Sequence, residues 1–184
     1  MRPTPDAAGA CSGSVSSVSP TLTHELAGAL DALQEQMSAA FANHTPRRAL
    51  AACATGGFSV LGVGGRRLAV AAGAGLVAKL AFRREGLVDN ELEWRVWRGA
   101  SETLRELLAP TVGRTPGGVN LQRRCLPVSP DALELPHQLT RPLARAGITD
   151  AVLNLGLLDE RVVCYDYALL APERARMLLS GPPR

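Results

Sequence analysis

The first apolar pattern along the chain predicts a helix over residues 19–45. Ser19 and Pro20 are a typical helix start, a capping residue followed by proline at the first helical position. After them, apolar side chains recur every three or four residues, at Leu22, Leu26, Leu30, Leu33, Met37 and Phe41. Because this spacing places them on one helical face, we expect an N-terminal amphipathic helix that packs against the rest of the protein. Residues 1–18 offer few groups to bury and are expected to be a disordered tail.

Residues 50–82 predict three short antiparallel strands. Glycine pairs and a Gly-Ala-Gly triplet divide this segment into β-prone apolar runs, over residues 58–63, 68–72 and 76–82. The next segment, residues 90–108, is polar and rich in helix-forming residues. We therefore expect a strand meander followed by one helix.

The remaining segments predict one strand, one hairpin and two short helices. Residues 119–126 are a strand candidate, and residues 152–158 and 161–167 are the two strands of a hairpin. Helices are expected over residues 130–146 and 173–179, and two prolines make the first of them short or kinked. This mixture of strands and helices indicates an α+β fold.

The composition excludes several classes of protein. An apolar fraction of 46% and a charged fraction of 20% exclude collagen-like, coiled-coil and wholly disordered chains. A net charge of +3 and an aromatic fraction of 4% provide neither a strongly basic surface nor a stacking platform for nucleic acid. The chain has no apolar run of about 18 residues and no apolar leader segment. We therefore expect a cytoplasmic protein that binds neither nucleic acid nor membrane.

Lys79 is the single lysine among 20 basic residues, the other 19 being arginine. It lies within the apolar run 76–82, where an unpaired ammonium group is costly to bury. One interpretation is that a compact ammonium group is needed there for function, and the alternative is an edge-strand lysine that reaches solvent. The best carboxylate partner is Glu93, because Trp97 lies four residues after it on the same helical face. Glu91 is the second candidate and points to a different face.

A glycine-rich hairpin precedes Lys79 and predicts a site for phosphate groups. Glycine has no Cβ, so backbone N–H groups beside it can approach a phosphate closely. The candidates are Gly57, Gly62, Gly64 and Gly65. Because ordinary turns are also rich in glycine, this signal is informative only together with Lys79.

Asp150, Asn154 and Asp166 lie close to the last predicted hairpin and are candidates for further chemistry. Asn154 and Asp166 flank the hairpin and could converge on one Mg²⁺, which takes few protein oxygens besides water and phosphate. The alternatives are a backbone-bonding turn residue at Asn154 and a strand cap at Asp166.

In their order along the chain, these residues resemble the protein-kinase-like superfamily, in particular its small, divergent members from bacterial and bacteriophage genomes. Residues 56–65 resemble the glycine-rich loop, and residues 77–79 are similar to the strand motif V-A-I-K. The resemblance implies that Lys79 binds the α- and β-phosphates of ATP. Residues 90–97 resemble the helix whose glutamate, here Glu93, holds that lysine.

The second half of the chain continues the resemblance. Asn154 matches the catalytic-loop asparagine, and residues 165–168 are similar to the D-F-G segment, with Asp166 as its metal-binding aspartate. The implied fold is a kinase-like N-lobe over residues 50–128, a five-stranded antiparallel sheet plus one helix. A truncated C-lobe over residues 129–184 and an extra N-terminal helix complete it.

Two departures from the family pattern affect catalysis. No H-R-D motif precedes Asn154, and Asp150 stands four residues before it where the pattern has five. Asp150 is therefore a displaced candidate for the catalytic base. Only 18 residues follow Asp166, too few for an activation segment and a full helical lobe.

The sequence therefore supports two main hypotheses. The first is an ATP-binding, Mg²⁺-using kinase-like protein with weak or absent phosphotransferase activity, in which Lys79, Glu93 and Asp150 act in catalysis. The alternative is a pseudokinase scaffold, or a phage or virion accessory protein, that acts through protein–protein contacts. A third interpretation is an α+β domain whose motif order is accidental. Because a shortened second lobe would expose apolar surface, we also expect a protein partner or a homo-oligomer.

Overall fold

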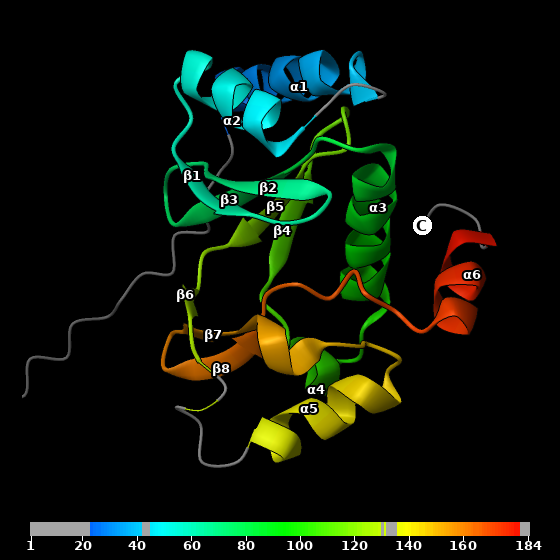
Figure 1. The fold of residues 1–184 in the computed structure, drawn as a ribbon. Helices are drawn as coiled ribbons and strands as arrows, with labels where there is room; N and C mark the ends of the chain where they lie inside the picture. The colour runs from blue at the N-terminus through cyan, green and yellow to red at the C-terminus, as the bar shows by residue number, and fades with distance from the viewer. Residues whose placement is uncertain (1–22, 42–44, 130, 132–135, 181–184) are drawn as a thin grey trace, which may run out of the picture.

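Six α-helices, eight short strands and a 3₁₀-helix (Ala151–Asn154) are present among the described residues of this computed structural model, namely 23–41, 45–129, 131 and 136–180 (Figure 1). The strands form two antiparallel sheets, one of five strands and one of three. This confirms the α+β class and the antiparallel sheet predicted from the sequence. The expected tail over residues 1–18 and the expected helix start at Ser19 and Pro20 lie outside the described residues.

The larger sheet contains the three strands of the predicted meander and two further strands. Their spatial order is β1 (Val60–Val63), β2 (Arg67–Ala71), β3 (Leu76–Ala81), β5 (Asn120–Arg123) and β4 (Thr111–Arg114). The hydrophobic pattern did not predict β4, because this strand has only four residues and includes a glycine and an arginine.

Alternation along β2 and β3 gives the larger sheet one apolar and one polar face. Leu68 of β2 pairs directly with Leu80 of β3, and both side chains are buried in the apolar core. Arg67 and Lys79 are each one position away, so they lie on the opposite face. Arg67 and Lys79 are thus neighbours on one surface of the sheet.

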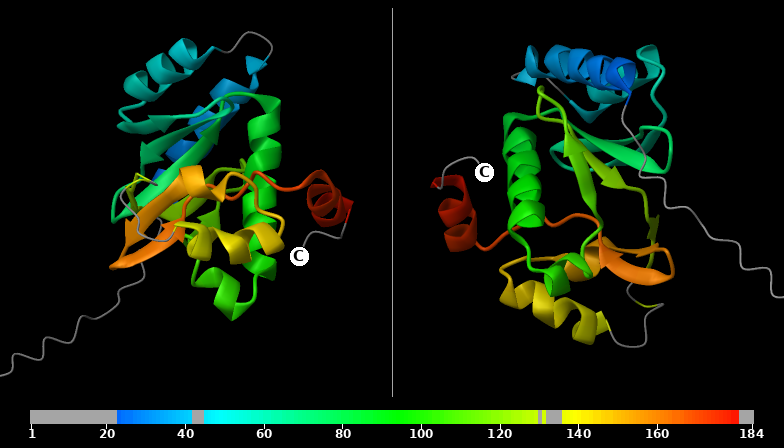
Figure 2. Two further views of the ribbon diagram at one scale, coloured as in Figure 1. Left: turned by 60° about the horizontal axis from the view of Figure 1, so that its bottom comes forward. Right: turned by 180° about the vertical axis from the view of Figure 1, so that it is seen from behind.

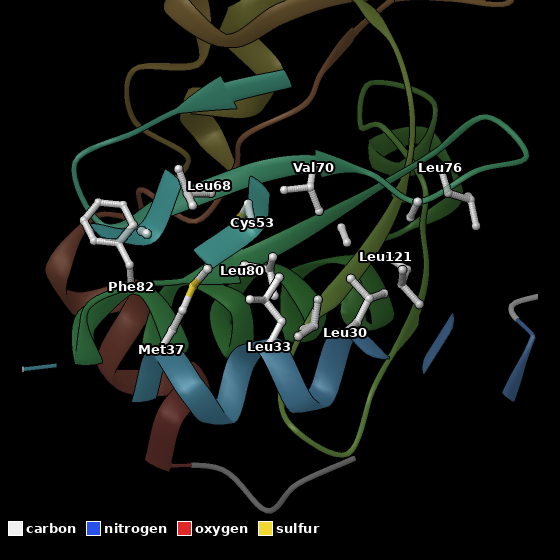
Figure 3. Close-up of a cluster of buried hydrophobic side chains, with 14 residues drawn as sticks. Leu30, Leu33, Met37, Cys53, Leu68, Val70, Leu76, Leu80, Phe82 and Leu121 are labelled. Atoms are coloured by element: carbon white, nitrogen blue, oxygen red, sulfur yellow. The ribbon is translucent and has the colours of Figure 1, made fainter. Parts of the chain in front are cut away.

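Helices α1 (His24–Ser38) and α2 (Pro46–Thr55) cover the apolar face of the larger sheet (Figure 1). Leu30, Leu33 and Met37, three members of the predicted apolar stripe, are buried against the strands together with Cys53 of α2 (Figure 3). The expected packing role of the N-terminal helix is therefore confirmed.

The bounds of these two helices differ from the expected single helix over 19–45. Thr23 caps α1 by accepting a hydrogen bond from the backbone N–H of Leu26, and α1 ends at Ser38. Thr45 caps α2 in the same way, with Pro46 as its first residue. A threonine followed by proline can come after one helix or begin the next one. The sequence alone indicated only the end of a helix at Thr45 and Pro46.

Gln34 attaches α1 to the end of β3. Its side-chain Nε2 donates to the carbonyl oxygen of Ala81 at 2.9 Å, and its Oε1 accepts from the N–H of Ala81 at 2.8 Å. The amide thus satisfies the same two backbone groups that a neighbouring strand would. About one turn earlier in the same helix, Asp31 Oδ1 accepts from the N–H of Gly117 at 3.0 Å.

Helix α3 (Arg84–Gly99) connects the two halves of the molecule. It begins six residues before the expected start at residue 90 and ends at Gly99. The short helix α4 (Glu102–Arg105) follows, capped by the hydroxyl of Ser101. The expected helix over 90–108 is therefore two helices, because Ser101 starts a new one.

The smaller sheet contains β6 (Leu126–Pro127), β7 (Leu155–Leu158) and β8 (Arg161–Cys164), in this order. β7 and β8 form the predicted hairpin. Asp159 and Glu160 at its turn have φ values of 48° and 63°, as a two-residue type I′ turn requires.

A second apolar core lies around the smaller sheet, at the opposite end of the molecule from α1 and α2 (Figure 2). Helices α5 (Pro136–Arg145) and α6 (Pro172–Ser180) occupy most of the two expected helical segments. Val96 of α3, Leu155 of β7 and Tyr167 are buried in this core. Among the described residues, no helix has both the length and the apolar character needed to cross a membrane.

Replacing Gln34 with alanine should lower the free energy of unfolding by about 2–3 kcal/mol, because both backbone groups of Ala81 would lose their buried partner. Urea unfolding followed by tryptophan fluorescence measures this change. Gln36→Ala is the matched control, since Gln36 lies on the exposed side of the same helix, and it should change the stability by less than about 0.5 kcal/mol. Equal effects of the two substitutions would contradict this role for Gln34.

Candidate functional site

A cavity of about 460 Å³ adjoins the polar face of the larger sheet. Its walls are the β1–β2 loop, the two strands that carry Arg67 and Lys79, one residue of α3, and the segment that follows β8. The lining residues are Gly62, Val63, Gly64, Gly65, Arg66, Arg67, Leu68, Ala69, Lys79, Asp89, Asn154, Tyr165, Asp166, Ala168 and Leu169. Segments about 100 residues apart in the sequence thus meet at one cavity.

Lys79 and Glu93 form the ion pair predicted from the sequence. The distance from Lys79 Nζ to Glu93 Oε1 is 2.6 Å, and the carboxylate is fully buried. Lys79 Nζ also donates to the carbonyl oxygen of Tyr165 at 2.5 Å. Glu91, the second candidate, is only half-buried and binds Arg95 and Arg114 instead.

Arg67 is the residue of this site that sequence reasoning missed. Its Nη1 donates to Asn90 Oδ1 at 3.1 Å, and its Nη2 donates to Glu93 Oε1 at 3.2 Å and to Asp166 Oδ1 at 2.7 Å. Burial alone lowers the pKa of this guanidinium, but the charges of Glu93, Asp166 and Asp89 outweigh it and raise the pKa above its ordinary value. Arg67 is therefore a permanent positive charge between α3 and the segment after β8.

The alternation along β2 contains a signal that could have identified Arg67. Leu68 and Val70 are the core positions of this strand, so Arg67 and Ala69 must face the other side. Ala69 is the register partner of Lys79, which places Arg67 diagonally next to Lys79 on the same face.

Asp166 is held as a charged carboxylate by its neighbours. Burial raises the pKa of this group, but the positive charges of Lys79 and Arg67 lower it more strongly, to about 2. Its side chain is one-third exposed, at 33%, and its Oδ1 also accepts from the N–H of Ala168 at 3.4 Å. Asp166 therefore lines the cavity, and its Oδ1 is bound to the fixed guanidinium group of Arg67.

The β1–β2 loop is held against the first turns of α3. Arg66 Nη1 lies 3.3 Å from Asp89 Oδ1, and the carbonyl oxygen of Arg66 accepts from the N–H of Phe82 at 3.1 Å. A Cβ on Gly86 would lie 2.6 Å from that carbonyl oxygen, so only glycine permits this close approach. Burial raises the pKa of Asp89, and the charges of Arg67 and Arg66 lower it less than burial raises it.

Three of the four candidate glycines are brought to the cavity. Gly62 of β1 lines it, together with Gly64 and Gly65 of the loop between β1 and β2. Gly57 lies instead in the turn after α2, with φ of 74°, and is not among the lining residues. The glycine-rich segment of the sequence therefore contains two separate turns.

Asn154 lines the cavity, whereas Asp150 does not. The side-chain Nδ2 of Asn154 donates to the backbone oxygen of Asp150 at 3.1 Å. Asp150 is exposed and has a φ of 54°, in the left-handed region. The structure thus brings Asn154 and Asp166 to one cavity and leaves the candidate base outside its lining.

Three cations, Arg66, Arg67 and Lys79, and two carboxylates, Asp89 and Asp166, line this cavity. Among the residues that the structure describes, no three or more His, Cys, Asp and Glu side chains form a group that could hold a metal ion. No protein-family model, curated protein or solved structure matches the chain. The features that bear on the function of the protein are therefore the glycine loop, the neighbouring cations Lys79 and Arg67, and the carboxylates that bind these two cations.

Gly86→Ala should destabilise the protein by about 1–3 kcal/mol, because the added methyl group pushes the β1–β2 loop away from α3. Urea unfolding at pH 7 tests this. The matched control is Gly99→Ala at the other end of the same helix, where a Cβ meets nothing within 4 Å. Since alanine is the better helix former, the control should be neutral or slightly stabilising, and a stabilising Gly86→Ala would contradict the close approach.

Acid should weaken the fold through Asp166. The folded-state pKa of about 2 lies below the ordinary value of 3.8, so the ionised group stabilises the fold above about pH 4 and loses this effect as the pH falls toward 2. We expect a loss of about 1 kcal/mol from this group, after allowing for its partial exposure. Urea unfolding from pH 6 to pH 2.5 should show a shallower acid slope for Asp166→Asn than for the wild type. Parallel curves would contradict the Arg67–Asp166 pair.

Proposed function

We propose that the cavity binds the phosphate groups of a nucleoside triphosphate such as ATP. The protein would then be a nucleotide-binding protein of the protein-kinase-like type, with weak or absent phosphotransferase activity. The observation that supports this most directly is Lys79, which lines the cavity beside the glycine loop and whose ammonium group is fixed by the fully buried Glu93.

The cavity offers the groups that an anionic ligand needs. Lys79 provides a compact, positioned charge, and Arg66 lines the cavity with a half-exposed side chain. Gly62 of β1 and the loop residues Gly64 and Gly65 add no side chains to the wall, so a phosphate can approach the backbone there. The volume of about 460 Å³ lies in the range usual for small-molecule sites.

The order of the elements supports the kinase-like interpretation. The lysine comes from the third strand of a five-stranded antiparallel sheet, and its glutamate comes from the helix that directly follows that strand. Asp166 reaches the same cavity from the segment after a later hairpin. This support is an analogy of arrangement, and the site itself is argued from its residues.

Binding is better supported than catalysis. Phosphoryl transfer benefits from a carboxylate base close to the acceptor. Asp150, the candidate for this role, is not among the lining residues of the cavity. We therefore propose that Lys79 and Glu93 act in binding the nucleotide and that Asp150 has no catalytic role.

The second candidate function is a scaffold that acts through protein–protein contacts or through self-association. It is favoured by exposed leucines around the smaller sheet, since Leu126 is 64% and Leu153 68% exposed. Leu157, the register partner of Leu126, is exposed as well. Such a surface is compatible with nucleotide binding, so the two functions are not exclusive.

ATP at about a hundredfold excess over its Kd should stabilise the folded protein by about 2.7 kcal/mol, which raises the Tm by roughly 5–10 °C for a chain of this size. Differential scanning fluorimetry measures the shift, with ATP added both with and without MgCl₂. Lys79→Met should abolish it. Arg84→Met removes a positive charge from an exposed position of α3 and should keep the full shift. If millimolar ATP shifts the wild type under neither condition, the nucleotide proposal fails and the scaffold remains.

A further inference from the structure

We infer that Arg67 takes the place of a divalent cation in this cavity, so that a nucleoside triphosphate binds without a metal ion. The inference rests on the proposed function, because it concerns the same cavity and the same ligand. It differs from what the kinase-like resemblance implies, namely a Mg²⁺ ion held by Asn154 and Asp166.

The position of the Arg67 guanidinium group opposes metal binding at Asp166. Arg67 Nη2 lies 2.7 Å from Asp166 Oδ1, the carboxylate that would have to bind the metal. The Arg67 side chain is only 10% exposed, so its charge is not free to move into solvent. A metal ion at Asp166 would therefore lie next to a fixed positive charge, which opposes its binding.

Arg67 is also anchored independently of Asp166. Its Nη1 binds Asn90 Oδ1 at 3.1 Å and lies 3.2 Å from Glu93 Oε2. Both partners belong to α3, and Glu93 is fully buried. Moving Arg67 aside to admit a metal would leave the Glu93 carboxylate with one partner fewer in the interior, which is costly. A guanidinium group also cannot give up its charge by losing a proton.

The charges at and behind the cavity wall balance one another. Three cations and two carboxylates line the cavity, and the third carboxylate, Glu93, is fully buried. The ion pairs are Arg66 with Asp89, Lys79 with Glu93, and Arg67 with Glu93 and Asp166. No carboxylate of this set is left without a positive partner that a metal would otherwise supply. Both terminal nitrogens of Arg67 already bind protein acceptors, so Arg67 acts as the counter-charge. Lys79 uses two of its three N–H donors, and the half-exposed Arg66 binds Asp89 through Nη1, so both keep donors for the phosphates.

Isothermal titration calorimetry of the wild-type protein with ATP tests the inference, in buffer with EDTA and in buffer with excess MgCl₂. We expect a Kd in EDTA within about threefold of the value in MgCl₂, or tighter. A tenfold or greater loss of affinity in EDTA would overturn the inference but leave the proposed function intact. Binding in neither buffer would overturn both.

Two substitutions make the test specific to the Arg67–Asp166 pair. Asp166→Asn leaves the charge of Arg67 without one of its two carboxylates, so ATP should bind at least threefold more tightly in EDTA. At a metal site the same substitution would weaken binding in MgCl₂, and that result would overturn the inference. Arg67→Gln should make ATP binding depend on MgCl₂, whereas Arg67→Lys should keep it independent. If Arg67→Gln does not fold, the comparison of EDTA with MgCl₂ and the Asp166→Asn variant still test the inference.

Discussion

The buried carboxylate of Glu93 is the constraint on which the arrangement of the site depends. A fully buried charge is tolerated only with partners of opposite sign, and Glu93 binds Lys79 from β3 and Arg67 from β2. Because the three residues belong to three elements, their ion pairs hold α3 against the polar face of the sheet. The position of the cavity follows, since its wall contains the same two cations.

The charge cluster also joins the two apolar cores of the molecule. Lys79 donates to the carbonyl oxygen of Tyr165, and Arg67 binds Asp166, so the segment after β8 is held at the larger sheet. The next residue, Tyr167, is buried in the second core and its hydroxyl donates to the carbonyl oxygen of Ala109 at 3.0 Å. The segment after β8 that lines the cavity is thus fixed on both sides, and the cavity lies between the two halves of the fold.

Local patterns predicted much of this structure, and distant contacts explain most of what they missed. Glycine turns between β-prone runs predicted the meander, helical spacing predicted the apolar stripe of α1, and the cost of burying Lys79 led to Glu93. Arg67 escaped because an Arg-Arg pair after two glycines is typical of an exposed turn, and its partner Asp166 lies 99 residues away. Asp150 was a candidate base only because of its spacing from Asn154. In the structure Asp150 has a left-handed backbone conformation and is not among the residues that line the cavity.

A crystal structure of the protein grown with ATP in the presence of EDTA would test the central claim most directly. We expect phosphate oxygens within hydrogen-bond distance of Lys79 Nζ, beside the glycine loop, with Arg67 still bound to Asp166. ATP bound at another surface, or Arg67 turned away from Asp166 to contact the phosphates, would contradict it.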